Sequence, residues 1–208
     1  QKYKILAVLK IDHLNDINEE KSKIEATLLN IIKQLLKEQK GSEAFKYKEN
    51  RFVVLLSFDS VNNGASDIKT GEILKHLMVF ANKYADISVS IGISNIFGYY
   101  SQMKEAYIQA DEACKFSFYK GPGTICKYRE GIFSDESRQV FSIKEQKELI
   151  DYMDICDSEN IKRIINNIID DIEKNYLPVE KSIQIFMEIF YCIGSVLKNY
   201  GIDFQNNG

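Results

Sequence analysis

The sequence predicts an α+β fold with an antiparallel central sheet, followed by a three-helix C-terminal extension. One observation is the order of the expected elements, which is β-α-β-β-α-β-α-β over residues 1–130 and helical throughout residues 131–208. The other is composition, because 45% of the 208 residues are hydrophobic and 27% are charged. That mixture supplies a packed core and excludes disorder as the main state.

The first half of the sheet is predicted by how the spacing of apolar residues changes along the chain. Tyr3–Ile11 (YKILAVLKI) is an apolar run of strand length. Asn18–Lys37 repeats apolar residues every three or four positions, as an amphipathic helix does, and Gly41 follows its end. Ala44–Tyr47 and Phe52–Phe58 are separated by a polar tetrapeptide, which predicts a β-hairpin.

The second half continues the alternation. A second helix is expected around residues 73–84, and Ile87–Ser94 (ISVSIGIS) follows as a strand with one solvent-exposed face. Ser101–Phe118 is an expected helix whose small residues suggest close packing on a sheet. Lys120–Gly123 predicts a tight turn into a last strand, Thr124–Tyr128. A split β-α-β arrangement around an antiparallel hairpin is the ferredoxin-like plan.

Helical patterns alone follow, at Ser142–Met153, Ser158–Asn175 and Pro178–Tyr200. Ser142 and Glu145 have the spacing of a capping box, and Ser158 is an expected N-cap. The last two helices carry apolar stripes, which predict either packing within the extension or a homodimer face or signal-transmitting linker. The stripe residues are Ile161, Ile164, Ile165, Ile168, Ile169, Ile172, Ile185, Phe186, Ile189, Phe190 and Ile193.

Charge and cysteine usage exclude several classes of function. The net charge is −3, and from residue 141 onward 7 basic residues face 12 acidic ones, so direct nucleic-acid binding by this chain is not expected. The 4 cysteines contain no CxxC pair and there are 2 histidines, so neither a zinc site nor another metal or cofactor is expected. Scattered thiols and the lack of a long apolar run predict a reduced, cytoplasmic protein without membrane contact.

Four segments occur in the order found in GGDEF domains, the diguanylate cyclases and their degenerate relatives. They are KIDHLNDIN (Lys10–Asn18), FKYKENRFVVLLS (Phe45–Ser57), SVSIGIS (Ser88–Ser94) and ADEACKFSFYKGPG (Ala110–Gly123). The resemblance spans residues 3–130. It implies a nucleotidyl-cyclase-type fold, and in active members carboxylates hold the divalent metal that joins two GTP molecules.

The resemblance also implies that the catalytic positions are lost. The first aspartate of the DxD pair falls on Lys10, and only the second, Asp12, remains. The signature Gly-Gly-Asp/Glu-Glu falls on Lys48, Glu49, Asn50 and Arg51. Lys10 and Arg51 are therefore cations at positions where metal-binding carboxylates are expected. Such a site repels Mg²⁺, and no catalytic residue is expected.

The nucleotide positions depart in the same way. Only Asn18 matches the asparagine that meets guanine, and the Arg-x-x-Asp of the product site falls on Gln39 and Ser42. The phosphate-binding Lys and Arg fall on Phe118 and Pro122. Lys10, Asp12, Asn18 and Lys48–Arg51 thus form either a remodelled ligand cleft or a solvated turn, with Asp12 expected to pair with Lys10. His13 as a general base is the weaker alternative to a packing or surface histidine.

A narrower resemblance is carried by Lys46–Ser57 and Ser90–Asn95. Both are similar to the degenerate GGDEF-like central region of AraC-type, response-regulator-like transcriptional regulators of Firmicutes. It implies an upstream receiver or sensor module, two-component signalling, and a downstream helix-turn-helix module that reads DNA. Separately, the chain's own ends, Gln1 and Gln205–Gly208, suggest a domain cut from a longer polypeptide.

The expected function is therefore non-catalytic signal transmission and homodimerisation within a transcriptional regulator. Two alternatives stay open. One is a ligand-binding sensor that uses the degenerate nucleotide cleft, and the remote one is an active diguanylate cyclase with unusual metal ligands.

Overall fold

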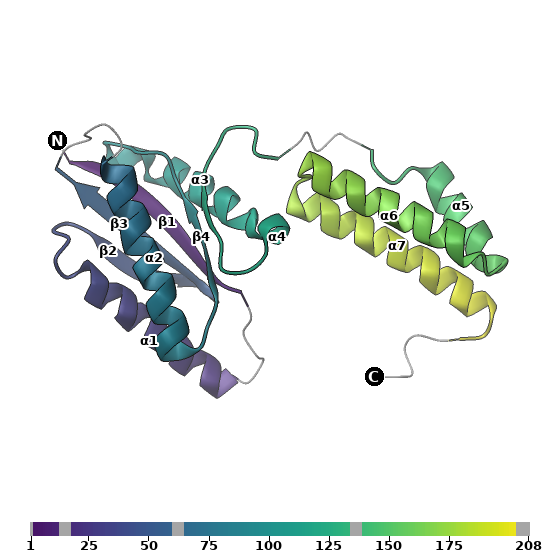
Figure 1. Ribbon diagram of the computed structural model, residues 1–208, viewed down its shortest axis with the longest axis horizontal. Helices are drawn as coiled ribbons and strands as arrows, with labels where there is room; N and C mark the ends of the chain where they lie inside the picture. The colour runs from purple at the N-terminus through teal and green to yellow at the C-terminus, as the bar shows by residue number, and fades with distance from the viewer. Residues whose placement is uncertain (1, 13–17, 60–64, 134–138, 203–208) are drawn as a thin grey trace. The chain divides into compact units, whose positions relative to one another are not determined.

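The computed structural model describes residues 2–12, 18–59, 65–133 and 139–202, with the side chains of residues 18–20 and 65 excepted. The chain divides into two compact units, Gln1–Glu130 and Gly131–Gly208. Figure 1 shows a sheet with helices in the first unit and helices alone in the second. Within the described residues, no helix is long and apolar enough to cross a membrane.

Unit 1 is built on a five-stranded mixed sheet in the order β2-β3-β1-β4-β5. The strands are β1 (Tyr3–Ile11), β2 (Glu43–Lys48), β3 (Arg51–Phe58), β4 (Val89–Ile93) and β5 (Ile125–Lys127). The first three pairings are antiparallel, but β5 runs parallel to β4. The expectation of an antiparallel sheet is therefore wrong for this pair, because a helical crossover joins β4 to β5 and returns the chain in the same direction.

Helices cover both faces of the sheet. Helices α1 (Asn18–Leu36) and α2 (Ala65–Ala85) pack on one face, and α3 (Met103–Lys115) packs on the other. The alternation of β1 divides the core accordingly, since successive side chains of a strand point to opposite faces. The face under α1 and α2 takes Ile5, Ala7, Leu9 and Ile11, whereas the face under α3 takes Leu6 and Val8.

The helix predicted over Ser101–Phe118 is interrupted. The short 3₁₀ helix η1 (Tyr100–Gln102) precedes α3, and the single-turn α4 (Ser117–Lys120) follows it. Gly121 then takes φ +87°, a left-handed conformation that suits glycine, as the predicted turn requires.

Strand β4 has no solvent-exposed face, so that expectation is wrong. Ser90 and Ser94 are fully buried, because α3 lies directly on the strand. Ser94 compensates by accepting a hydrogen bond from the Leu6 amide (3.0 Å) and donating one to the Asn95 carbonyl (2.8 Å). A Cβ placed on Gly92 would lie 2.0 Å from the Ala110 carbonyl oxygen, which shows how closely the helix approaches.

Unit 2 contains α5 (Ile143–Asp154), α6 (Ser158–Asn175) and α7 (Val179–Asn199). The predicted capping box is confirmed, since the Ser142 hydroxyl accepts from the Glu145 amide (3.3 Å) and the Glu145 carboxylate accepts from the Ser142 amide (2.7 Å). The N-cap of α6 is Asp157 rather than Ser158, because the longer carboxylate reaches the Asn160 amide (3.1 Å). The Asn160 side-chain amide also donates to this carboxylate (2.7 Å), and this bond, followed by the backbone one, lowers the pKa of Asp157.

The apolar stripes of unit 2 pack only in part. Ile164, Ile168 and Ile172 of α6 are buried, as are Ile185 and Ile189 of α7. Phe190, predicted in the same stripe, is instead 63% exposed. The packing interpretation thus accounts for one face of α7 and leaves another apolar face in solvent.

We expect the buried thiol of Cys114 to resist alkylation while the exposed Cys156 reacts. Burial of Cys114 between α3 and the sheet raises its pKa to about 12, so the reactive thiolate is scarce near about pH 8. Mass spectrometry after brief iodoacetamide treatment should show Cys114 modified at least about ten times more slowly than Cys156. Equal rates in the folded protein would contradict this packing, and equal rates in urea are the control.

The raised pKa of Cys114 also makes the stability of the folded protein depend on pH. Above the ordinary thiol pKa the unfolded chain loses its Cys114 proton while the folded chain keeps it, so this residue lowers stability as pH rises from about 9 toward about 12.

Candidate functional site

The structure brings most of the predicted site residues to one end of the sheet. Lys10, near the end of β1, lies opposite Arg51, the first residue of β3, in the antiparallel register. The β2–β3 turn carries Glu49 and Asn50 beside them. Asn18 is the first residue of α1, but its side chain lies outside the described residues, as does the whole of His13.

A buried carboxylate from α1 holds the β2–β3 turn. Glu25 is only 5% exposed, and it accepts a hydrogen bond from the Asn50 amide (2.9 Å) and another from the Lys46 ammonium (2.5 Å). Asn50 has φ +58°, a left-handed conformation that asparagine tolerates better than most residues. Its carbonyl accepts from the Ile11 amide (3.1 Å), so the turn is tied to β1 as well. Glu25 did not emerge from the sequence, because a lone acid in an amphipathic helix resembles a surface residue.

The Arg51 cation has an ionic partner of its own. The Arg51 guanidinium forms an ion pair with Asp111 of α3, and both side chains are about three-quarters buried, at 24% and 23% exposure. Asp111 is also a residue that sequence reasoning missed. Its position in the segment ADEACK, one helical turn before the buried Cys114, was the available signal. Arg51 therefore links the hairpin to the helix across the sheet.

Two other predicted residues lie on the surface. Glu49 forms an ion pair with Lys21 of α1, and that contact lowers the pKa of Glu49. Lys48 is exposed and places its ammonium 5.2 Å from the ring centroid of Tyr47. These contacts are those of an ordinary hairpin surface rather than of a shaped pocket.

Asp12 does not pair with Lys10, and that expectation is wrong. Its carboxylate accepts hydrogen bonds from the hydroxyls of Ser88 (2.6 Å) and Ser90 (2.5 Å) and from the Gly123 amide (2.8 Å). Lys10 lies in β1 and is exposed, whereas Asp12 follows the end of β1 and turns toward β4 and the turn before β5. Asp12 thereby ties three segments of the sheet edge together.

Carboxylates do not converge here as a metal centre needs. Within the described residues, no group of three or more His, Cys, Asp or Glu side chains lies close enough to hold a metal ion. Asp12 and Asp111 each engage donors of the chain itself, and Lys10 and Arg51 add positive charge.

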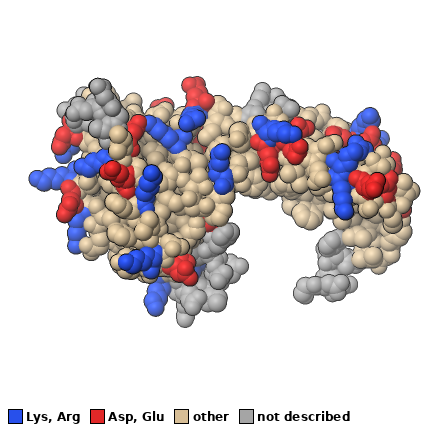
Figure 2. Space-filling model, viewed as in Figure 1, with Lys and Arg blue, Asp and Glu red and all other residues tan. Residues whose placement is uncertain are grey.

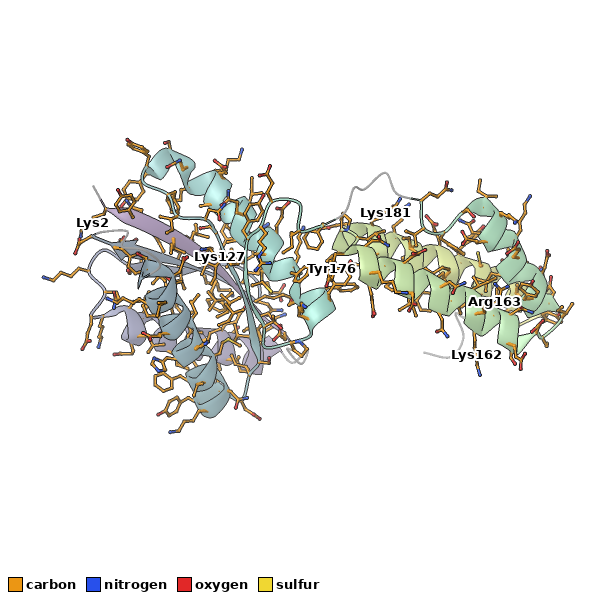
Figure 3. The ribbon with its side chains drawn as sticks, turned by 45° about the horizontal axis from the view of Figure 1, so that its top comes forward. Lys2, Lys127, Lys162, Arg163, Tyr176 and Lys181 are labelled. Atoms are coloured by element: carbon orange, nitrogen blue, oxygen red, sulfur yellow. The ribbon has the colours of Figure 1, made fainter. Side chains whose placement is uncertain are left out.

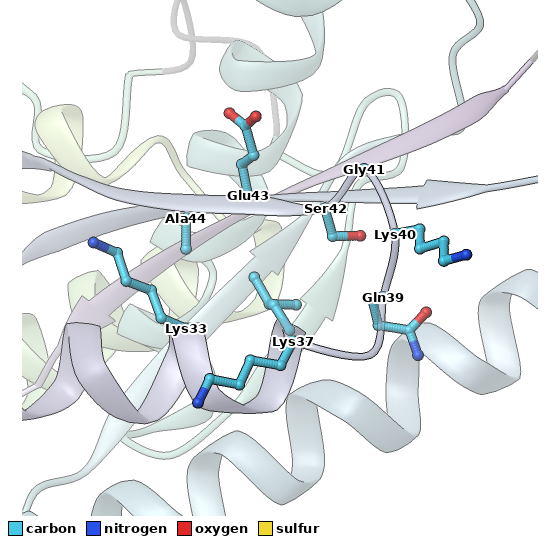
Figure 4. A pocket seen from close by; sticks show the side chains of 9 residues that line it. Lys33, Lys37, Gln39, Lys40, Gly41, Ser42, Glu43 and Ala44 are labelled. Carbon is cyan, nitrogen blue, oxygen red and sulfur yellow. The ribbon is translucent and has the colours of Figure 1, made fainter.

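A hollow of 470 Å³ lies at a different place, between the end of α1 and the start of β2. It is lined by Gln39 and Ser42, the residues on which the sequence resemblance places the Arg-x-x-Asp motif. Lys33 and Lys37 lie on the α1 side of β2, whereas Glu43 points to the other side (Figure 4). The Ser42 hydroxyl accepts from the Ser57 amide (3.0 Å), so it serves the backbone of β3.

Charges on the face of unit 1 that Figure 2 shows are mixed rather than segregated. On the face that Figure 2 shows, basic and acidic side chains lie next to one another. Lys2 and Lys127, labelled in Figure 3, form ion pairs with Asp59 (3.8 Å) and Asp67 (2.7 Å). A face with such mixed charges does not attract a polyanion by bulk electrostatics.

We expect loss of the Glu25 carboxylate to destabilise unit 1 by about 2 kcal/mol, because Glu25→Ala strands the Asn50 amide and the Lys46 ammonium. Urea unfolding followed by circular dichroism measures the change. The matched control is Glu49→Ala, which removes a mostly exposed carboxylate of the same hairpin and should leave stability almost unchanged. Equal effects of the two variants would contradict the role given to Glu25.

Comparison with known proteins gives one kind of match. No protein-family model matches the chain, and no curated protein matches its sequence. Several solved structures similar to it are GGDEF domains. One is the GGDEF domain of PA1120 (YfiN or TpbB) from Pseudomonas aeruginosa, at 15% identity and TM-score 0.48, over 62% of this chain and 83% of that one.

Two further GGDEF structures match a similar share of this chain. The active GGEEF domain of a diguanylate cyclase from Vibrio cholerae has 16% identity and TM-score 0.45, over 63% of this chain and 85% of that one. The GGDEF domain of DgcB from Caulobacter crescentus, solved with c-di-GMP, has 17% identity and TM-score 0.43, over 61% and 78%. These likenesses assign no activity to the chain.

Proposed function

We propose that residues 1–130 are a degenerate GGDEF-like domain without cyclase activity, which transmits a signal inside an AraC-type transcriptional regulator. The observation that carries the proposal is the pairing at the hairpin. Arg51 occupies an acidic position of the GGDEF signature and is neutralised by Asp111, so the turn is held by the chain's own charges. A cyclase instead needs carboxylate oxygens free to bind divalent metal.

Asp12 supports the same conclusion. It matches the remaining aspartate of the DxD pair, and both of its oxygens already accept hydrogen bonds from three donors. Metal binding there would have to break these bonds while Lys10 adds a positive charge two residues away. Coulomb repulsion therefore opposes a divalent cation at this end of the sheet.

In this proposal the chain is a cytoplasmic part of the regulator and binds no DNA itself. Upstream, a receiver or sensor module supplies the signal; downstream, a helix-turn-helix module reads the promoter. The coding sequence on both sides of these 208 residues is the direct test of the parent. Two helix-turn-helix patterns after Gly208 would support the proposal, and a stop codon or a phosphodiesterase domain there would contradict it.

The ligand-sensor alternative makes a different prediction. If the degenerate cleft binds a nucleotide or cyclic dinucleotide, that ligand raises the melting temperature by mass action. We expect no shift with GTP, ATP or cyclic dinucleotides in the presence of Mg²⁺, because Arg51, Glu25 and Glu49 are engaged with protein partners. A shift that disappears in an Arg51→Ala variant would favour the sensor over the signal-transmitting domain.

A further inference from the structure

Helix α7 carries a second apolar face opposite the one that packs in unit 2. The buried face consists of Ser182, Ile185, Ile189, Cys192 and Val196. On the outer face, Ile183 is 51% exposed, Met187 64%, Phe190 63% and Tyr191 80%. A helix of a protein that works alone normally turns polar residues to solvent, so this face calls for a partner.

The spacing of the outer face is that of a coiled-coil seam. Ile183, Met187, Phe190, Gly194 and Leu197 follow one another at steps of four and three residues. This alternation gives the 3.5-residue period that keeps a stripe facing a second helix along its whole length. Gly194 contributes no bulk, and a Cβ added there would meet no atom within 4 Å.

The charge pattern permits a second copy of the same helix to approach. From Ser182 to Leu197 the helix has a single charged residue, Glu188. Its carboxylate accepts hydrogen bonds from Gln146 of α5 (3.3 Å) and from Gln184 (2.9 Å). Cationic side chains lie elsewhere, with Lys181 at the start of α7 and Lys162 and Arg163 on α6 (Figure 3).

We propose that the outer face of α7 is a homodimer interface in which α7 pairs antiparallel with α7 of a second copy. In that register Ile183 of one copy lies level with Gly194 of the other, so that a large side chain fills the space above a small one. Met187 lies level with Phe190, a favourable sulfur–aromatic contact. A parallel pair would instead place Gly194 opposite Gly194 and leave a gap in the seam.

The exposed area is close to what a specific dimer needs. At roughly 200 Å² for a whole large side chain, the four exposed residues supply about 500 Å² per copy and about 1,000 Å² per pair. The half-buried Phe186, Ile193 and Leu197 border the seam and add to it. Specific interfaces begin at about 1,200 Å² in total.

The inference deepens the proposed regulatory function by naming a partner for it, and it rests on that function only for its biological meaning.

Sedimentation of the 208-residue chain at low and high micromolar concentration tests the dimer. We expect a species of twice 24.0 kDa, and Phe190→Glu should raise the dissociation constant about 100-fold or more while the far-ultraviolet spectrum stays unchanged. The matched control is Ile143→Glu, which charges an equally exposed residue at the start of α5 and should leave the dimer intact. A monomer at high micromolar concentration, or equal effects of the two variants, would overturn the inference.

Cross-linking tests the direction of pairing. In a Cys156→Ser background, a mixture of Ile183→Cys and Gly194→Cys chains should form a disulfide between the two variants, and neither variant should link to itself. Self-linking of each would show a parallel pair and overturn the proposed register. Cyclase activity is a separate readout, because an active dimer would refute the proposed function alone and an inactive monomer would refute this inference alone.

Discussion

Gly92→Ala is expected to prevent unit 1 from folding stably, with a loss of at least about 4 kcal/mol, a large part of the stability of a typical domain. The added Cβ would lie 2.0 Å from the Ala110 carbonyl oxygen and 2.2 Å from the Cys114 amide nitrogen. Both are backbone atoms of α3, so no side chain can rotate away, and the helix would have to leave the sheet.

Urea unfolding of the soluble fraction measures this loss, and Gly71→Ala is its control. Gly71 lies within α2 with no atom within 4 Å of the added Cβ, so that alanine should stabilise the helix by about 0.5–1 kcal/mol. If the Gly92 variant unfolds within about 1 kcal/mol of the unchanged chain, α3 does not approach β4 as closely as described.

Asp12→Ala is expected to destabilise unit 1 by about 3 kcal/mol, because it strands three donors that converge on one carboxylate. Asp12→Asn should cost clearly less, since an amide can still accept one of these bonds and donate another. The measurement is thermal or urea unfolding with and without Mg²⁺.

The Mg²⁺ arm separates a structural role from a metal site. If Asp12 only joins strands, Mg²⁺ leaves the stability of the unchanged chain and of both variants as it was. Stabilisation by Mg²⁺ that is lost in Asp12→Asn would show a working metal ligand and contradict the structural role.

Local patterns predicted most elements, since the apolar period and the turn residues are read within a few positions of one another. The parallel direction of β5 was also within reach, because α3 between two strands implies a crossover. Strand β4 misled for a physical reason. Its serines and glycine are typical of a solvent-exposed face. Their small size instead allows the small residues of α3, among them Ala106 and Ala110, to pack against the strand.

The contacts of the candidate site could not be predicted in the same way. The sequence aligned Lys10, Asp12 and Arg51 with GGDEF positions, but their partners lie far along the chain. Asp12 reaches Ser88 and Gly123, and Arg51 reaches Asp111. Such pairings depend on how the sheet and helices assemble, and no local period encodes them.

The central claim, a GGDEF-like domain without catalysis, is tested most directly by incubating the 208-residue chain with GTP and Mg²⁺ or Mn²⁺ for a prolonged time. Chromatography with mass spectrometry would follow pyrophosphate and cyclic dinucleotide, beside an active diguanylate cyclase as positive control. The account predicts that neither product forms, because the proposal assigns Lys10 and Arg51 to positions where a cyclase needs metal-binding carboxylates. Cyclic dinucleotide made by the chain, and lost in an Asp12→Asn variant, would contradict it.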